Sequence, residues 1–254
     1  MQFFNEIIGI VSKYWQMLLK GLGYTMLIAL VGTLVGLVIG LLTGVLRTIP
    51  KSKNTFLRIL QKIMNFIIAV YVEIFRGTPM MVQAMVIFWG YAFMAGGNTL
   101  PVIGAGLFIV SINTGAYMAE IVRGGIMSID KGQFEGAHAI GMNHFQTMFY
   151  VVLPQAIRNI LPSVANEFII NIKDTSVLNV IGVAELYYNA YKIQTINYKI
   201  FQTYVIVSVM YFAMTFTVSR LLRLLEKAMN GKNSYVVLGS QSDPAAEIRV
   251  KEAE

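Results

Sequence analysis

The chain has 254 residues and a mean hydropathy of +0.62, and only 13% of its side chains are charged, against about a quarter in soluble domains. Its net charge of +7 comes from Lys and Arg residues that stand beside apolar runs, where they set membrane orientation, so the excess does not indicate nucleic-acid binding. The sequence contains no cysteine, which excludes disulfides, iron–sulfur clusters and thiolate zinc sites.

Long uncharged stretches predict helices that cross a membrane. Residues 24–46, 77–119 and 200–219 contain no charged side chain. A helix needs about 20 mainly apolar residues to cross a bilayer, so these stretches predict one, two and one spans. The alternation of apolar and polar residues that marks membrane β-barrels is missing. The sequence therefore predicts an all-α integral membrane protein.

The first 20 residues predict an amphipathic helix that is retained. They lack the basic start, the long apolar core and the small-residue cleavage site of a signal peptide. Tyr14 and Trp15 are side chains that favour the headgroup region. We therefore expect residues 1–20 to lie at the membrane surface, ahead of a membrane domain that covers residues 21–230.

The first span, about 22–46, has a glycine at every fourth position. This bare face lets another helix approach closely, either within the chain or from a second copy, and packing within the chain is the favoured interpretation. The glycines are Gly32, Gly36, Gly40 and Gly44. Five basic residues and no acidic one follow in 47–62, which indicates a cytoplasmic loop.

The apolar run 63–95 is interrupted near its middle. Gly77 and Pro79 predict a kink or break there, because proline lacks a backbone donor and glycine loosens the helix. Glu73 and Arg76 are three positions apart and can pair on one helix face, either to brace the break or to contact a substrate.

The third span, 102–122, contains polar residues, which are costly inside a membrane and are therefore candidates for function. Asn113 and Tyr117 share a face of this helix. Glu120 stands at i, i+3 with Arg123 and is interpreted mainly as structural, with a cytoplasmic gate as the alternative.

The fourth span, 159–184, is apolar only in part. Glu167, Asn171 and Asp174 share one face of a helix, and we expect Glu167 and Asn171 to line a pathway. Asp174 and its neighbour Lys173 are expected to brace the end of the span.

Between these two spans, residues 131–154 gather glycine, amide and histidine side chains. A short helix is expected at 133–142, and two glycines in it suggest close contact with another protein, since each costs about 1 kcal/mol relative to alanine. The alternative is a cytoplasmic loop with incidental small residues. Leu153 and Pro154 are expected to end the segment and redirect the chain. Its two histidines fall on different sides of a helix and predict no metal site.

A fifth span, 200–222, ends in a basic run. With five spans, the basic segments 47–62, 123–158 and 220–232 all lie on one side of the membrane. The N-terminus is therefore expected outside, and the C-terminus in the cytoplasm with a polar tail at 231–254.

One motif carries a family resemblance. The letters EGA, three further residues, G, nine further residues and VVLP, within 135–154, resemble the E-A-A, G, I-x-L-P loop of ABC importer permeases. Glycine replaces the second-place alanine and valine the isoleucine. Segments 73–83, 115–133 and 172–186 resemble the polar amino acid branch of these permeases, the histidine/glutamine type. The resemblance covers about residues 20–230.

The resemblance implies a type I ABC importer permease fold with five transmembrane helices. It implies a second permease subunit, the same or a related chain, an extracytoplasmic amino-acid-binding protein, and two ATPase subunits that bind ATP and Mg²⁺. It also implies a coupling helix at about 131–145 that docks in the ATPase. The residues expected to carry this coupling are Glu135, Gly136, Ala137, Gly141, Leu153 and Pro154.

No nucleotide-binding loop of the G-x-x-x-x-G-K-[ST] type occurs in the sequence, so the chain is not expected to be an enzyme or to hold a cofactor itself. We expect the permease subunit of an ATP-driven importer of polar amino acids, in the bacterial plasma membrane, that opens alternately to each side. The alternatives are a permease for another small solute, an ion-coupled secondary transporter or channel, and a membrane protein of assembly or signalling. The pathway candidates are Glu73, Arg76, Asn113, Tyr117, Glu120, Glu167, Asn171 and Asp174.

Overall fold

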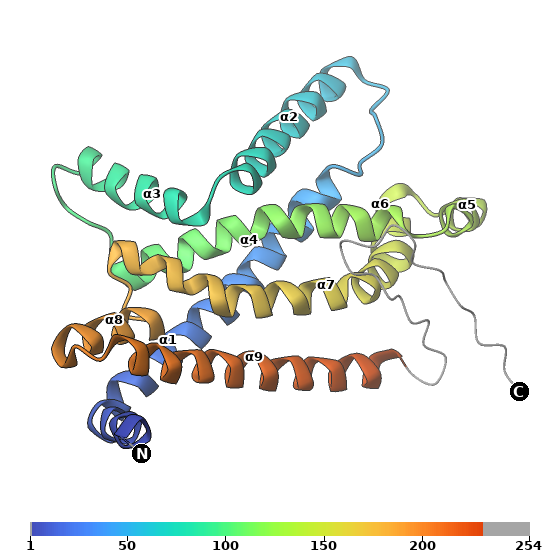
Figure 1. Ribbon diagram of the computed structural model, residues 1–254. Helices are drawn as coiled ribbons and strands as arrows, with labels where there is room; N and C mark the ends of the chain where they lie inside the picture. The colour runs from blue at the N-terminus through green and yellow to red at the C-terminus, as the bar shows by residue number, and fades with distance from the viewer. Residues whose placement is uncertain (1, 231–254) are drawn as a thin grey trace, which may run out of the picture.

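The computed structural model describes residues 2–230, which form an elongated bundle of helices (Figure 1). The tail expected at 231–254 lies outside the described residues. In chain order the elements are α1 (Gln2–Leu46), α2 (Thr55–Gly77), α3 (Met80–Met94), α4 (Val102–Met127), α5 (Lys131–Ala139), α6 (His144–Thr147), the π-helical turn η1 (Met148–Val152), α7 (Leu153–Asp174), the 3₁₀ segment η2 (Thr175–Ile181), α8 (Leu186–Asn197) and α9 (Ile200–Asn230). Regular structure within residues 2–230 is helical throughout, so the all-α prediction is confirmed.

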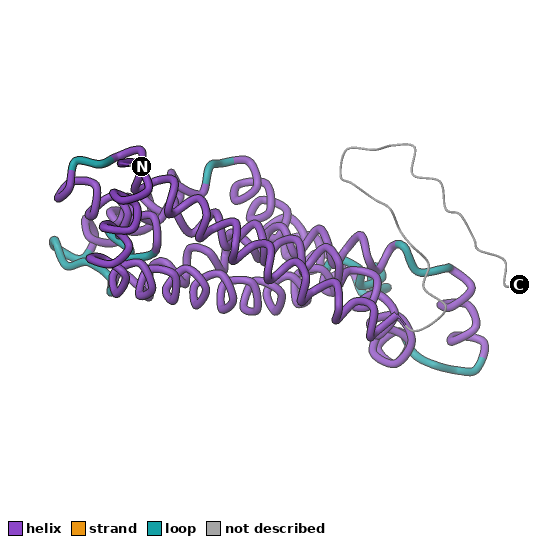
Figure 2. The backbone as a smooth tube through the Cα atoms, turned by 60° about the horizontal axis from the view of Figure 1, so that its bottom comes forward, coloured by secondary structure: helices purple, strands orange, loops and turns teal. Residues whose placement is uncertain are grey.

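The two ends of the bundle carry different parts of the chain. In Figure 1, α5 and α6 lie at one end, whereas α8 and the first turns of α1 lie at the other. Figure 2 shows the same separation after a 60° turn, with the N-terminus far from the end that carries the short helices. The long helices α1, α4, α7 and α9 run between the two ends.

Four helices are long and apolar enough to cross a membrane: α1, α2, α4 and the part of α9 from Ile200 to Leu225. Helix α3 is apolar but shorter. Helix α7 has 22 residues and begins at Leu153, six residues before the expected start at 159, because Leu153 and Pro154 were interpreted as the end of the preceding segment. The remainder of the expected span 159–184 is the 3₁₀ segment η2 and the loop after it.

The amphipathic segment 1–20 and the first span were expected as separate helices, and the structure joins them in α1. The first proline of the sequence is Pro50, so no residue before it interrupts the backbone hydrogen bonds of the helix. The helix bends instead. In Figure 1 its first turns are seen nearly end on, while the rest runs across the view.

The glycine face of α1 packs against α4, which confirms the prediction that it serves packing within the chain. A Cβ added to Gly36 would lie 2.8 Å from the Cβ of Thr114, closer than side chains tolerate. The backbones of α1 and α4 therefore lie close together, which is possible only where small residues line the contact between two helices. From Gly32 to Gly44 the four glycines face, in order, Val110, Thr114, Met118 and Val122.

The segment 131–154 differs from its prediction in two places. Helix α5 ends at Ala139, and Gly141 follows it with a φ of +84°, so Gly141 provides a left-handed turn rather than a close helix contact. Leu153 and Pro154 do not end a segment. They form the first turn of α7 and follow directly on the π-helical turn η1. The chain thus stays helical from His144 to Asp174.

Candidate substrate pathway and coupling segment

The break between α2 and α3 leaves backbone carbonyls without helical partners. The carbonyl of Phe75 would accept from the N–H of residue 79, which is proline and has none. Gln83 Nε2 takes its place, at 2.9 Å from the oxygen of Phe75 and 2.9 Å from the oxygen of Thr78. The predicted break at Gly77 and Pro79 is confirmed, and Gln83, which the sequence analysis missed, stabilises it.

Asn113 belongs to the same polar cluster. Its Nδ2 donates to Gln83 Oε1 at 2.9 Å and to the carbonyl of Phe75 at 3.3 Å. Both amides are buried. The pathway candidate Asn113 therefore connects α4 to the break between α2 and α3, which is stabilised by side chains from α3 and α4.

Arg76 stands just before the break and is exposed. Its guanidinium lies over the ring of Tyr117, 5.6 Å from the ring centroid, which brings these two candidates together. The pair that Arg76 was expected to form with Glu73 is not among the ion pairs within residues 2–230. Glu73 is exposed on α2.

Asn171 lies at the crossing of three helices. Its Nδ2 donates to Thr33 Oγ1 of α1 at 2.8 Å, and Thr114 Oγ1 of α4 donates to its Oδ1 at 3.1 Å. Only 3% of Asn171 is exposed. Both ends of its amide are engaged within the protein, so the contacts of Asn171 hold α1, α4 and α7 together.

Glu167, one helical turn before Asn171, is also buried, but its side chain has no such partners. Only 6% of the residue is exposed, yet no side-chain hydrogen bond or ion pair within residues 2–230 involves its carboxylate. A buried carboxylate is costly unless a cation or a donor reaches it, so Glu167 can receive a positively charged group.

Lys173 and Asp174 are both exposed at the end of α7. Lys173 borders a groove of about 280 Å³ between α7 and α9. Arg220 and Arg223 of α9 border it too, with Phe212 and Phe216 beside them. None of these three cations takes part in an ion pair within residues 2–230, so the groove can accept a carboxylate.

Glu120 is held by two arginines at the end of α4 that is near α5. Arg123 Nη2 lies 2.8 Å from Glu120 Oε2, and Arg47 Nη1 contacts Glu120 Oε1. The Glu120–Arg123 pair was expected, but Arg47 was interpreted only as a loop charge. Together the three residues join the end of α1 to α4.

A second buried carboxylate, Glu185, was missed in the sequence analysis because it stands in a loop of nearly balanced charge. It caps α8 by accepting from the N–H groups of Tyr187 and Tyr188, at 2.9 and 2.7 Å. Tyr211 Oη donates to it at 2.8 Å from α9, and Thr25 Oγ1 of α1 at 3.4 Å. Glu185 is fully satisfied and joins three helices at the end opposite to α5.

The coupling candidates lie on an exposed projection formed by α5 and α6. Asp130 caps α5 through the N–H of Gly132 at 2.7 Å, and Asn143 and Gln146 form a capping box at α6. Glu135 and Gly136 are exposed, and a Cβ on Gly136 would meet nothing within 4 Å, so this face is free to contact another protein.

Two of the remaining coupling candidates, Ala137 and Leu153, pack the projection against the bundle. Ala137 is 5% exposed, and Leu153 packs against the apolar cluster beneath α5 and α6. Pro154 is exposed in the first turn of α7.

Burial and the charge of neighbouring His138 lower the pKa of His144 in α6.

These features define a multi-pass membrane protein with polar side chains at its helix crossings and a polar projection at one end. Over residues 58–231 it matches the family described as binding-protein-dependent transport system inner membrane component, and it belongs to that family. The resemblance drawn from the sequence motifs is thereby confirmed.

Among curated relatives, the glutamine transport system permease protein GlnP of Escherichia coli (strain K12) is 40% identical over 167 residues, which are 66% of this chain and 76% of that protein. The L-cystine transport system permease protein TcyB of Bacillus subtilis (strain 168) is 39% identical over 168 residues, which are 66% of this chain and 71% of that protein.

Solved structures share the fold. A structure described as the crystal structure of an amino acid ABC transporter with histidines superposes with a TM-score of 0.73 at 37% identity, over 85% of this chain and 95% of that one. An inward-facing structure of the MetNI methionine ABC transporter has a TM-score of 0.65 at 19% identity, over 85% of this chain and 99% of that one.

Proposed function

We propose that this chain is the transmembrane permease subunit of an ATP-driven importer of polar amino acids. The family and the named substrates of its relatives, glutamine and L-cystine, support an amino acid as the substrate. The chain provides the pathway and opens alternately to each side, while a separate ATPase subunit binds ATP and Mg²⁺ and hydrolyses the nucleotide. A second permease subunit, the same or a related chain, completes the pathway.

Five spans are proposed, namely α1, α2 with α3, α4, α7 with η2, and α9. The N-terminus is then outside, α5 and α6 are in the cytoplasm, and the membrane is the bacterial plasma membrane. The basic residues 47–62 and the basic end of α9 support this orientation, because cytoplasmic loops carry the excess of Lys and Arg.

The substrate is proposed to meet the polar face of α7. A zwitterionic amino acid needs a carboxylate for its ammonium group and a cation or N–H donors for its own carboxylate. Glu167 has no hydrogen-bond or ion-pair partner of its own, and Arg76 is a cation without a carboxylate partner within residues 2–230. Polar side chains such as Lys173 and Asp174 are too costly to face lipid, which supports a water-filled pathway beside them.

The other candidates are assigned to positioning. Asn113 and Asn171 hold helices at the edge of this site, Tyr117 orients Arg76, and Glu120 fastens α1 to α4 on the cytoplasmic side. Glu73 remains a pathway candidate by its exposure within α2. The surface that binds the ATPase is proposed to be formed and supported by Glu135, Gly136, Ala137, Gly141, Leu153 and Pro154.

The observation that carries this proposal is Glu167, a buried residue whose carboxylate makes no hydrogen bond or ion pair within residues 2–230. Its test uses the complex with the ATPase in nanodiscs, with amino-acid-stimulated ATP hydrolysis and transport as readouts. Glu167→Gln should abolish stimulation while assembly and thermal midpoint are kept. Ser163→Ala, an exposed neutral position one turn away, is the matched control. Stimulation that persists in Glu167→Gln contradicts the assigned site, and transport driven by an ion gradient without the ATPase contradicts the function.

A further inference from the structure

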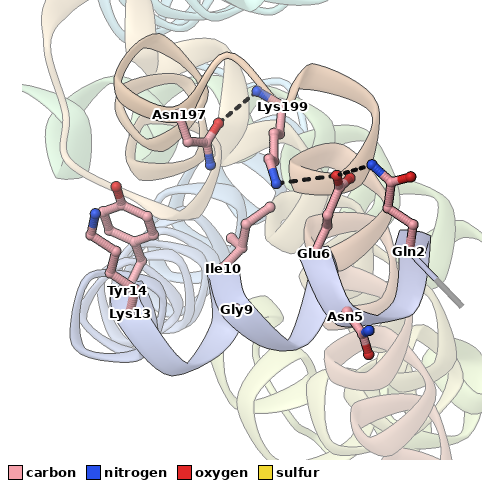
Figure 3. A pocket seen from close by; sticks show the side chains of 9 residues that line it. All are labelled: Gln2, Asn5, Glu6, Gly9, Ile10, Lys13, Tyr14, Asn197 and Lys199. Atoms are coloured by element: carbon pink, nitrogen blue, oxygen red, sulfur yellow. Dashed lines mark hydrogen bonds and ion pairs between the residues drawn. The ribbon is translucent and has the colours of Figure 1, made fainter.

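A groove of about 580 Å³ lies between the first turns of α1 and the turn from α8 to α9, at the end of the bundle opposite to α5 (Figure 3). Its floor is Ile10 and Tyr14, and Glu6 and Lys13 border it from α1. Lys199 crosses the groove with its Nζ 3.3 Å from Glu6 Oε1. The pathway candidates line no part of it.

The first turns of α1 have a buried apolar face, an exposed apolar face and a polar face that borders the groove. Ile10, Tyr14 and Leu18 are buried against α8 and α9. A second face is apolar yet 40% to 68% exposed, as expected of a surface in contact with lipid. It consists of Phe4, Ile8, Val11, Trp15 and Leu19.

The groove opens on the side away from this apolar face. At 100° per residue, Gln2, Glu6 and Lys13 centre about 160° around the helix from the apolar stripe. When the stripe rests on the bilayer, the groove faces water. A lipid headgroup is therefore a poor occupant, and a soluble molecule is favoured.

The groove offers hydrogen-bond donors that lack acceptors. Lys13 takes part in no ion pair within residues 2–230, and its Nζ lies 5.4 Å from the ring centroid of Tyr14. Asn197 Oδ1 accepts from the N–H of Lys199 at 2.7 Å, but its Nδ2 is buried without a partner. Two ammonium groups and a free amide donor border the groove, against the single carboxylate of Glu6, which is already paired.

We propose that this groove receives an acidic side chain of the extracytoplasmic binding protein when that protein docks. This inference rests on the proposed function, which places the N-terminus outside. The carboxylate contacts Lys13 and the Nδ2 group of Asn197, and it competes with Glu6 for Lys199. The two joined surfaces of α1 and α8–α9 thus form one part of the docking site.

The first test is a charge reversal at the groove. The permease–ATPase complex is placed in phosphatidylcholine nanodiscs, and the Kd for the purified binding protein of the same transport system is measured at several salt concentrations. Lys13→Glu should raise this Kd roughly tenfold at low salt and flatten its salt dependence. Lys20→Glu, the same change on the same helix outside the groove, should alter it less than twofold. Equal effects of the two variants overturn the proposal.

The second test targets the free amide donor. Asn197→Asp keeps the oxygen that accepts from Lys199 but replaces the donor with an acceptor, so it should raise the Kd as Lys13→Glu does. Asn98→Asp, in the exposed turn after α3, is the control and should leave the Kd unchanged. An unchanged Kd in Asn197→Asp overturns the proposal.

Carbodiimide cross-linking reports the contact directly, because it joins an ammonium group to a touching carboxylate. An intrachain Glu6–Lys199 link, expected from their ion pair, is the positive control that the reagent reaches the groove. A link from Lys13 to an Asp or Glu of the binding protein supports the proposal, and links that form only at other lysines overturn it.

Two further outcomes separate the possible causes. If the Lys13→Glu effect occurs only in nanodiscs that contain phosphatidylglycerol, the groove binds lipid and the proposal fails. Basal ATP hydrolysis and assembly should be normal in every variant. If the binding protein fails to stimulate ATP hydrolysis by the unaltered complex, the proposed function is wrong, and the proposed docking site is wrong as well.

Discussion

The side-chain amide of Gln83 lies 2.9 Å from the carbonyl oxygen of Phe75, in the position of the backbone N–H that Pro79 lacks. One glutamine on α3 thereby completes the hydrogen bonding of the last turn of α2. The break is held in place, because the carbonyls of Phe75 and Thr78 both accept from the side chain of Gln83.

Replacement of Gln83 should loosen this joint. Gln83→Leu leaves the carbonyls of Phe75 and Thr78 without their donor, at a cost of about 1–3 kcal/mol for unpaired buried groups. The thermal midpoint of the purified protein should fall by several degrees. Gln16→Leu, at an exposed position of α1, is the control. Equal midpoints for the two variants would show that the amide of Gln83 is dispensable.

The α1–α4 seam predicts opposite signs for the same substitution at two glycines of one helix. Gly36→Ala places a methyl group 2.8 Å from Thr114 and should destabilise the protein by about 1–3 kcal/mol. Gly23→Ala meets nothing within 4 Å and should stabilise it by up to about 1 kcal/mol, since alanine favours the helix. Denaturation in detergent measures both. A stabilising Gly36→Ala would mean that the helices do not touch there.

Gly141 and Gly136 differ in a similar way within the coupling segment. Gly141→Ala forces a side chain into a left-handed conformation, at a cost of about 1–2 kcal/mol, and should reduce the amount of ATPase that co-purifies. Gly136→Ala restores the alanine of the family motif at an open helical position and should retain the ATPase. Gly141→Asn should retain more than Gly141→Ala, because asparagine tolerates that conformation. Full retention in Gly141→Ala would contradict the turn.

His144 predicts a pH dependence of stability. Its pKa is lower in the folded protein than in the unfolded chain, because burial and His138 disfavour the charged form. The folded state therefore binds fewer protons, so this contribution is complete above about pH 6.5 and is lost as pH falls through the lowered pKa. The thermal midpoint should drop between about pH 7 and pH 5, and His144→Gln should reduce that drop. An identical drop in the variant would assign it to other groups.

Much of the fold could be predicted from the sequence because membrane helices are long apolar runs, and Pro79 marks the break plainly. The predicted start of α7 was wrong by six residues, since Pro154 was interpreted as the end of a segment. Gly141 was assigned to a helix because composition does not reveal the sign of φ. In both places backbone geometry, rather than residue type, decides the outcome.

The candidate site could be predicted only as a set of polar residues. Sequence spacing placed Glu167 and Asn171 on one face, but it gave no means to see that Asn171 is fully engaged with Thr33 while Glu167 has no such partner. Gln83, Arg47 and Glu185 were missed because their partners are distant along the chain. Contacts between distant helices depend on the packing of the whole bundle.

The unbroken helical run from His144 to Asp174 has a mechanical consequence. The projection and the buried Glu167 stand on one rod of about 45 Å, with no slack loop between them. Motion imposed at the cytoplasmic tip is therefore transmitted as tilt or rotation of the entire rod. Bending along it should concentrate at two points, the π-helical turn at Met148–Val152 and Pro162 inside α7, which lacks a backbone donor.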